Sequence, residues 1–228
     1  MDAIHFTLVN KGTMPHSIDF DAAEIAPNRA YINVQPGKSF KFDWVASQPG
    51  VFMYHCASQP VLQHIGNGMY GMVIVDPKNQ TRPPTREYAI VQSELYFGGQ
   101  GQVGSLEKMM AEDSDWIVFN GYADQYVDHP LIAKPGERVR LYILNAGPSK
   151  WSAFHVIGTI FDHTLQEGVT GGPGQTTNIA PSQGAMVDFS MDENGMYPFV
   201  THAFCDAVKG AIGMFKVANG GPASAGGH

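Results

Sequence analysis

The first half of the chain is matched, segment by segment, by the second half. Each half contains strand-length runs of alternating apolar and polar residues separated by turn residues. The matched pairs are residues 4–20 (IHFTLVNKGTMPHSIDF) with 138–158 (RVRLYILNAGPSKWSAFHVIG), 35–56 (QPGKSFKFDWVASQPGVFMYHC) with 180–202 (APSQGAMVDFSMDENGMYPFVTH), and 68–75 (GMYGMVIV) with 210–217 (GAIGMFKV). Two copies of one antiparallel all-β unit predict tandem Greek-key β-sandwiches. The only helix signal is SLEKMMAED, with Ser105 as its N-cap.

The segment between the copies sets the expected domains. DPKNQTRPPTRE is rich in proline and charge, which predicts a boundary between domains spanning residues 1–79 and 80–218. The Gly/Ala/Ser-rich residues 219–228 are expected to form a disordered tail. In the second copy, residues 80–137 precede the first matched strand. In the first copy, only residues 1–3 precede the equivalent strand. The first domain is therefore expected to lack its opening strands and to leave a sheet edge open.

One stretch of the first half concentrates residues that bind metals. The segment VFMYHCASQPVLQHIGNGMYGM contains Cys56, His64 and Met69, and His16 lies upstream in MPHSIDF. Two imidazoles, one thiolate and a weak thioether form the ligand set of a blue-copper site. The alternative is a buried free cysteine, a core methionine and two histidines with ordinary hydrogen bonds.

Bulk properties exclude several classes of function. The formal net charge is −7 and no basic run is present, which argues against nucleic acid as a partner. No apolar run approaches the ~18 residues of a membrane span. The start, MDAIHFTLVN, is typical of a strand and not of a signal peptide. The two cysteines give no disulfide framework, and Cys205 is expected to be a small buried hydrophobe.

Five motifs carry a family resemblance: MPHSIDFDAA, YHCAS, LQHIGNGMYG, FHVIG and THAFCDA. In this order and spacing they resemble the copper-containing nitrite reductases and the wider two-domain multicopper oxidase family, from about residue 4 to residue 217. The resemblance implies two cupredoxin-like domains per chain and assembly as a homotrimer. It also implies a small redox protein as electron donor, a small-molecule substrate (nitrite), and a periplasmic or extracellular location.

The resemblance assigns roles to individual residues. His16, Cys56, His64 and Met69 resemble the type 1 copper ligands. His55 and His202 resemble type 2 copper ligands, with His202 donated to the neighbouring subunit. Asp19 and His155 resemble the acid–base pair over the type 2 copper. Ile157 resembles the apolar residue that shapes the same pocket.

One position departs from the family pattern. Asp21 stands where the family has a histidine, so a type 2 site would keep two imidazoles, with Asp21 as a carboxylate third ligand. Such a site could hold copper or another divalent metal such as zinc; the alternative is that the type 2 site is lost. If IDFD is extended, Asp19 and Asp21 share one face, where two carboxylates raise one pKa. The simpler readings are two solvated loop acids and, for His155, a packed core histidine.

The sequence therefore predicts a copper-dependent oxidoreductase of the nitrite reductase type. Because adjacent strand residues point to opposite faces, Cys56 can face one metal and His55 another. The alternative is a blue-copper electron-transfer or copper-binding protein with a single site, and a third is a copper-free relic. A laccase-like trinuclear cluster fits less well, because the chain has no His-x-His pair and reads His55-Cys56-Ala57 where such a cluster needs His-Cys-His.

Overall fold

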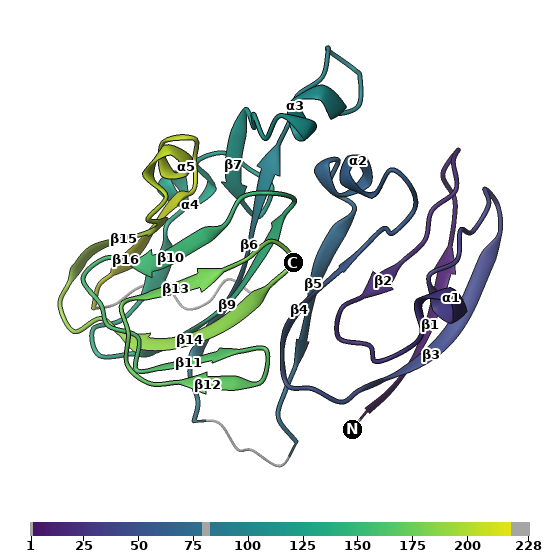
Figure 1. Cartoon of the computed structure of the whole chain (residues 1–228). Helices are drawn as coiled ribbons and strands as arrows, with labels where there is room; N and C mark the ends of the chain where they lie inside the picture. The colour runs from purple at the N-terminus through teal and green to yellow at the C-terminus, as the bar shows by residue number, and fades with distance from the viewer. Residues whose placement is uncertain (1, 79–82, 220–228) are drawn as a thin grey trace.

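The computed structural model of the chain describes residues 2–78 and 83–219, and confirms an all-β fold (Figure 1). In residues 2–78 the elements are β1 (Asp2–Val9), β2 (Asp19–Phe20), α1 (Pro27–Ala30), β3 (Ser39–Ala46), β4 (Gly50–His55), α2 (Val61–Gly66) and β5 (Tyr70–Val75). In residues 83–219 they are β6 (Arg86–Leu95), α3 (Leu106–Met110), β7 (Trp116–Phe119), α4 (Gln125–Asp128), β8 (Leu131–Ala133), β9 (Arg138–Gly147), β10 (Ser152–Val156), β11 (His163–Gln166), β12 (Val169–Gly171), β13 (Thr176–Ile179), β14 (Gly184–Ser190), β15 (Gly195–Thr201), α5 (Phe204–Val208) and β16 (Ile212–Val217). The predicted boundary at residues 79 and 80, and residues 220–228 of the predicted tail, lie outside the described residues.

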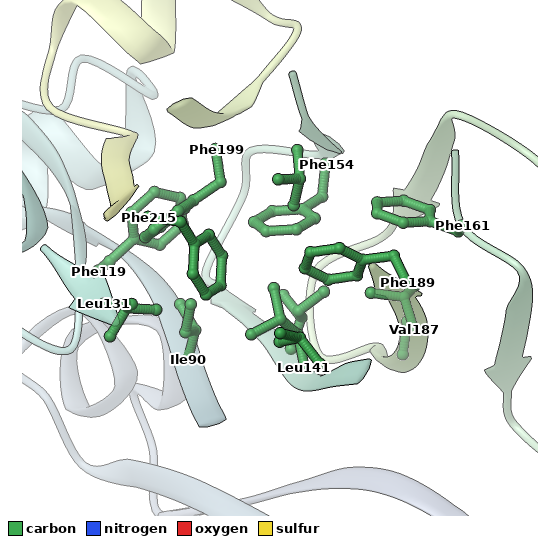
Figure 2. Close-up of a cluster of buried hydrophobic side chains, with 14 of the residues drawn as sticks. Ile90, Phe119, Leu131, Leu141, Phe154, Phe161, Val187, Phe189, Phe199 and Phe215 are labelled. Atoms are coloured by element: carbon green, nitrogen blue, oxygen red, sulfur yellow. The ribbon is translucent and has the colours of Figure 1, made fainter. Parts of the chain in front are cut away.

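The second half is a sandwich of two sheets. One sheet has the order β13-β10-β15-β16-β8 and the other β12-β11-β14-β9-β6-β7. Their inward-facing side chains form one buried cluster that is rich in phenylalanine, including Phe119, Phe154, Phe199 and Phe215 (Figure 2). Aromatic rings of this size bury a large apolar area, so this cluster is the main hydrophobic core of the chain.

The two halves pack against each other through β9. Along β9 the side chains of Leu141 and Ile143 point into the sandwich core, whereas Tyr142 and Leu144 on its other face join a second cluster. That second cluster also includes Val51 and other residues of the first half. Because successive strand residues face opposite sides, a strand buried on both faces reads as a continuous apolar run, as LYIL does here.

The first half contains two small sheets around a third cluster. β1 pairs with β3, and the other sheet has the order β2-β4-β5. Phe20 and Trp44 are buried at the centre of the cluster, with Phe6 and Phe42 packed around them. The alternation of IHFTLV and SFKFDW places these apolar side chains on one face of the β1–β3 sheet.

Two strand pairs are parallel, and each includes a strand that precedes the matched copy of the second half, β6 or β8. β6 pairs with β9 and β16 pairs with β8 in parallel register. These partners are not neighbours in sequence, so a pattern of consecutive hairpins cannot reveal them. The repeat equates β1 with β9 and β5 with β16.

Among residues 2–78, no strand takes the place that β6 or β8 holds in the second half, as predicted. Among the described residues, β1 pairs only with β3, and β5 pairs only with β4. Between the two small sheets lies an open cleft of about 790 Å³, lined by apolar side chains that include Ile4, Phe6 and Val73.

The helices are short. The predicted helix is confirmed as α3, with the Ser105 hydroxyl accepting a hydrogen bond from the Lys108 backbone NH at 3.3 Å. The other helices were not predicted; of these, α2 matters most because it carries His64. In the part of the chain that the structure describes, no helix combines the length and apolarity needed to cross a bilayer.

Candidate metal centres

Cys56 lies at the centre of the first group of potential ligands. It directly follows β4, and its Sγ lies 3.3 Å from His64 Nδ1 and 3.8 Å from His16 Nδ1. The rings of His16 and His64 are 5.2 Å apart and nearly perpendicular, and each presents its Nδ1 to the sulfur. Cys56 and His64 are buried. Met69 lines the same cavity of about 410 Å³ as His16 and Cys56.

Backbone hydrogen bonds bring these residues together from separate segments. His16 is held by a two-way bridge to Val34, with NH-to-oxygen distances of 3.2 and 2.8 Å. The buried amide of Asn10 donates to the Val34 carbonyl at 2.7 Å and keeps this loop closed. On the other side, the Cys56 NH donates to the Met69 carbonyl at 3.0 Å.

The donor set fits copper. The ligand atoms of His16, Cys56 and His64 all lie within 4.8 Å of one another. Burial and the neighbouring His16 lower the pKa of His64, which keeps that imidazole neutral and able to bind a metal. Two nitrogens, a thiolate and a nearby thioether suit an ion that alternates between Cu(I) and Cu(II).

His55 faces a second group, on the opposite side of the strand from Cys56. Antiparallel pairing of β2 with β4 sets Asp19 opposite His55. Ligand atoms of Asp19, Asp21 and His55 lie within 4.8 Å of one another, and His55 Nε2 is 3.7 Å from Asp21 Oδ1. His55 Nδ1 lies 3.0 Å from the Cys56 carbonyl, which can only accept, so the proton sits on Nδ1 and Nε2 is free to bind a metal.

Asp21 is held from the second half of the chain. The Ser182 hydroxyl donates to Asp21 Oδ2, which leaves Oδ1 directed to His55. Burial raises the pKa of Asp21; the Ser182 hydrogen bond and His55 oppose this effect, and Asp19 adds to it. The predicted pairing of the two acids is therefore confirmed, with burial as the larger cause of the shift. Burial and the Asp19 carboxylate likewise raise the pKa of Tyr31.

His155 and His202 form a separate pair. Their rings stack at 5.1 Å with an interplanar angle of 17°, and His155 Nδ1 donates to the Gln175 carbonyl. Within residues 2–78 and 83–219, neither group of converging ligand atoms includes them, and no hydrogen bond or ion pair joins His155 to Asp19. One chain thus brings His55 to Asp21 but leaves His202 apart from both.

Some residues around the two groups gave no signal in the sequence. Ser182 lies 161 positions from Asp21, and only a turn signal, PSQG, marks it. Asn67, which bonds to Gly104, and Met109, which packs on Gly66, are marked in the sequence only as a loop residue and a helix residue. The expectation of a buried Cys205 is wrong: this cysteine is exposed on the short helix α5, where its side chain can reach solvent.

Comparisons with known proteins agree with this arrangement. Residues 1–79 match a family model described as multicopper oxidase. The copper-containing nitrite reductase of Neisseria gonorrhoeae is 39% identical over 224 residues, which cover 94% of this chain and 57% of the relative. The copper-containing nitrite reductase of Pseudomonas chlororaphis is 29% identical over 246 residues, which cover 95% of this chain and 67% of the relative. The chain thus spans little more than half the length of the Neisseria relatives it matches.

Solved structures give the same result. The copper nitrite reductase of Nitrosomonas europaea superposes with a TM-score of 0.89 at 36% identity, covering 96% of this chain and 80% of that one. The copper-containing nitrite reductase of Thermus scotoductus superposes with a TM-score of 0.88 at 33% identity, and the match covers 97% of this chain and 53% of that one. On the fold, the converging His and Cys ligands and these similarities, the chain belongs to the copper-containing nitrite reductase family within the multicopper oxidases.

Proposed function

We propose that this chain is a copper-dependent oxidoreductase that reduces a small substrate, nitrite by its relatives' names. The observation that carries the proposal is the adjacency of Cys56 and His55 on either side of one strand end. Cys56 converges with His16 and His64, whereas His55 converges with Asp19 and Asp21. Two metal-binding groups are thereby joined through consecutive residues of one backbone.

The first group would hold the type 1 copper, with His16, Cys56 and His64 as close ligands and Met69 as the weak fourth. Copper bound there supplies reversible one-electron chemistry. The burial of Cys56 and His64 limits the access of water to the sulfur, and the backbone bonds from Met69 and Val34 hold the ligands in place. The Cys56–His55 backbone then offers an electron a covalent path from one group to the other.

The second group would hold a type 2 metal, either copper or another divalent ion such as zinc. His55 Nε2 and Asp21 Oδ1 are the ligand atoms in this chain, and His202 of a second copy would complete the set. Reduction of nitrite to nitric oxide and water consumes two protons and one electron. Asp19, beside His55, is suited to transfer one of those protons to the substrate, and His155 of the copy that donates His202 to transfer the other.

An interface between copies of this chain fits the position of His202. Phe204 packs edge-on against His202 at 5.4 Å and is 61% exposed, so the imidazole lies beside an apolar surface. Such a surface is typical of a contact between subunits. We propose a homotrimer, a small redox protein as electron donor, and a periplasmic or extracellular location, as in the family.

Asp21 favours a second candidate function. A carboxylate in place of an imidazole makes the second group more anionic, and this change could remove catalysis. The chain would then be a blue-copper electron-transfer or copper-binding protein with one metal site.

Metal analysis of the copper-loaded protein separates the two functions. The reductase predicts two metal ions per chain, thiolate-to-copper absorption and nitrite reduction with a small electron donor; Cys56→Ser should abolish the absorption. One copper per chain and no nitrite reduction would support the single-site protein. If Asp21→His gains nitrite reduction that the wild-type chain lacks, the natural chain is not a reductase.

A further inference from the structure

The short helix α3 of the second half packs directly on the segment that carries His64 and Met69. Gly66, two residues after His64, is buried in the last turn of α2. A Cβ added at Gly66 would lie 2.6 Å from Met109 Cε and 2.7 Å from its Sδ, closer than such atoms approach in proteins. Met109 is itself 1% exposed, so its side chain fills the space that glycine leaves.

Asn67 makes a second connection at the same place. Its amide NH₂ donates to the Gln63 carbonyl at 2.7 Å, and its Oδ1 accepts from the Gly104 NH at 2.7 Å. The side chain therefore closes the end of α2 and ties it to the residue before the Ser105 cap of α3. Figure 1 shows α2 and α3 at the same end of the molecule.

The packed segment leads straight to the candidate copper ligands. The Met69 NH donates to the His64 carbonyl at 3.1 Å, and the Cys56 NH donates to the Met69 carbonyl at 3.0 Å. Gly68 takes a left-handed conformation, φ +88°, which lets the chain turn between His64 and Met69. Hydrogen bonds thus join Asn67 to His64, His64 to Met69, and Met69 to Cys56, and Gly66 lies within this bonded segment.

The base of α3 is firmly held by the second half. The buried Glu94 carboxylate accepts from the backbone NH groups of Ser149 and Lys150, each at 2.7 Å, and from the Tyr96 hydroxyl. The Tyr96 carbonyl in turn accepts from the Ser105 NH at 3.0 Å. The contact on Gly66 therefore comes from a fixed element and not from a mobile lid.

We infer that Asn67, at the end of α2, and Met109, on α3 of the second half, are positioning residues that together set the geometry of the type 1 copper centre. The inference rests on the proposed function, because it concerns the same ligands. The axial thioether and the surroundings of the cysteine sulfur tune the potential of such a centre. The second half thereby contributes to the copper site of the first, although it supplies none of that site's ligands.

The first test compares two adjacent methionines of α3. Met109→Ala removes the buried contact, whereas Met110→Ala changes a side chain that is 71% exposed. In copper-loaded protein, Met109→Ala should shift the thiolate-to-copper absorption and the reduction potential, and weaken copper retention about 10-fold. Met110→Ala should leave all three unchanged. Phe215→Leu, in the core of the second half, serves as a control for lost stability alone and should leave the spectrum and potential unchanged.

Three further variants extend the test, and the first two keep it decisive if Met109→Ala does not fold. Asn67→Ala changes an exposed side chain and should shift the same spectrum and potential. Gly66→Ala should shift them by pressing its Cβ on Met109, and the double variant Gly66→Ala/Met109→Ala should lie closer to wild type than either single variant.

The outcomes are distinct. If wild-type protein develops the absorption and every variant keeps its spectrum and potential, the inference is overturned while the proposed function stands. If the same shift appears in Met110→Ala or Phe215→Leu, the effect is a loss of general stability and the inference is again overturned. If copper gives wild-type protein no such absorption, the proposed function itself fails.

Discussion

At the scale of single residues, Asp21 has the most distinctive surroundings. Its carboxylate lies 3.7 Å from His55 Nε2 and accepts a hydrogen bond from Ser182, and burial raises its pKa above the ordinary 3.8. At pH values between 3.8 and the folded-state pKa, the folded protein therefore holds a proton at Asp21 that the unfolded chain would release. The contribution of Asp21 to stability is fully present below pH 3.8 and is lost as the pH rises through the folded-state pKa.

Asp21→Asn should remove the loss of stability that accompanies ionisation of Asp21, because asparagine carries no charge to bury. In metal-free protein, the variant should become more stable than wild type as the pH rises through the folded-state pKa of Asp21. The difference should shrink towards zero near pH 3.8. Thermal unfolding across this pH range measures it, with Asp192→Asn, an exposed residue, as the control. A difference that stays constant with pH would contradict the prediction.

The sequence indicates the candidate metal ligands, but it does not indicate the contacts that hold those side chains in place. The group around Cys56 follows from residue types and spacing, and the opposite directions of Cys56 and His55 follow from strand alternation. The contact of Ser182 with Asp21 joins residues 161 positions apart and depends on how the halves pack. The exposure of Cys205 likewise depends on the placement of α5, which composition does not encode.

At the scale of elements, β14 of the second half crosses β4 of the first in close contact. Gly184 begins β14, and a Cβ there would overlap the Val51 carbonyl and side chain on β4. Gly184→Ala should destabilise the protein by about 1–3 kcal/mol, because the backbones would have to separate. The matched control is Gly172→Ala, where a Cβ meets nothing within 4 Å. Urea unfolding compares them; equal stabilities would show that the halves have room to move.

The strands were more predictable than the helices and the parallel pairs. Alternation marks β1 and β3 in the sequence because each buries one face, and a continuous apolar run marks β9 because it is buried on both. α2 begins after Pro60 without a side-chain cap and spans only Val61–Gly66, so it lacks both start signal and length. Its helical form comes from tertiary contacts, among them Met109 on Gly66.

At the scale of the whole molecule, the residues of the proposed second metal site lie in two separate places within one chain. His55, Asp19 and Asp21 converge on one surface, and His155 stacks on His202 at another. In the proposed ring of identical copies with head-to-tail contacts, the His55 surface of each copy would meet the His202 surface of the next. Each complete site would then draw on two chains, and the assembly would be required for the chemistry.

Mixing two inactive variants tests this sharing of sites. His55→Ala and His202→Ala should each bind no second metal in a homogeneous assembly, because every site lacks one imidazole. When the two are unfolded together and reassembled at equal amounts, about one quarter of the sites should combine an intact His55 with an intact His202. Second-metal content and nitrite reduction should recover to that fraction, with Cys56-dependent absorption unchanged as the control. If His202→Ala alone keeps its second metal, the site is complete within one chain, and Asp19, Asp21 and His55 are its ligands.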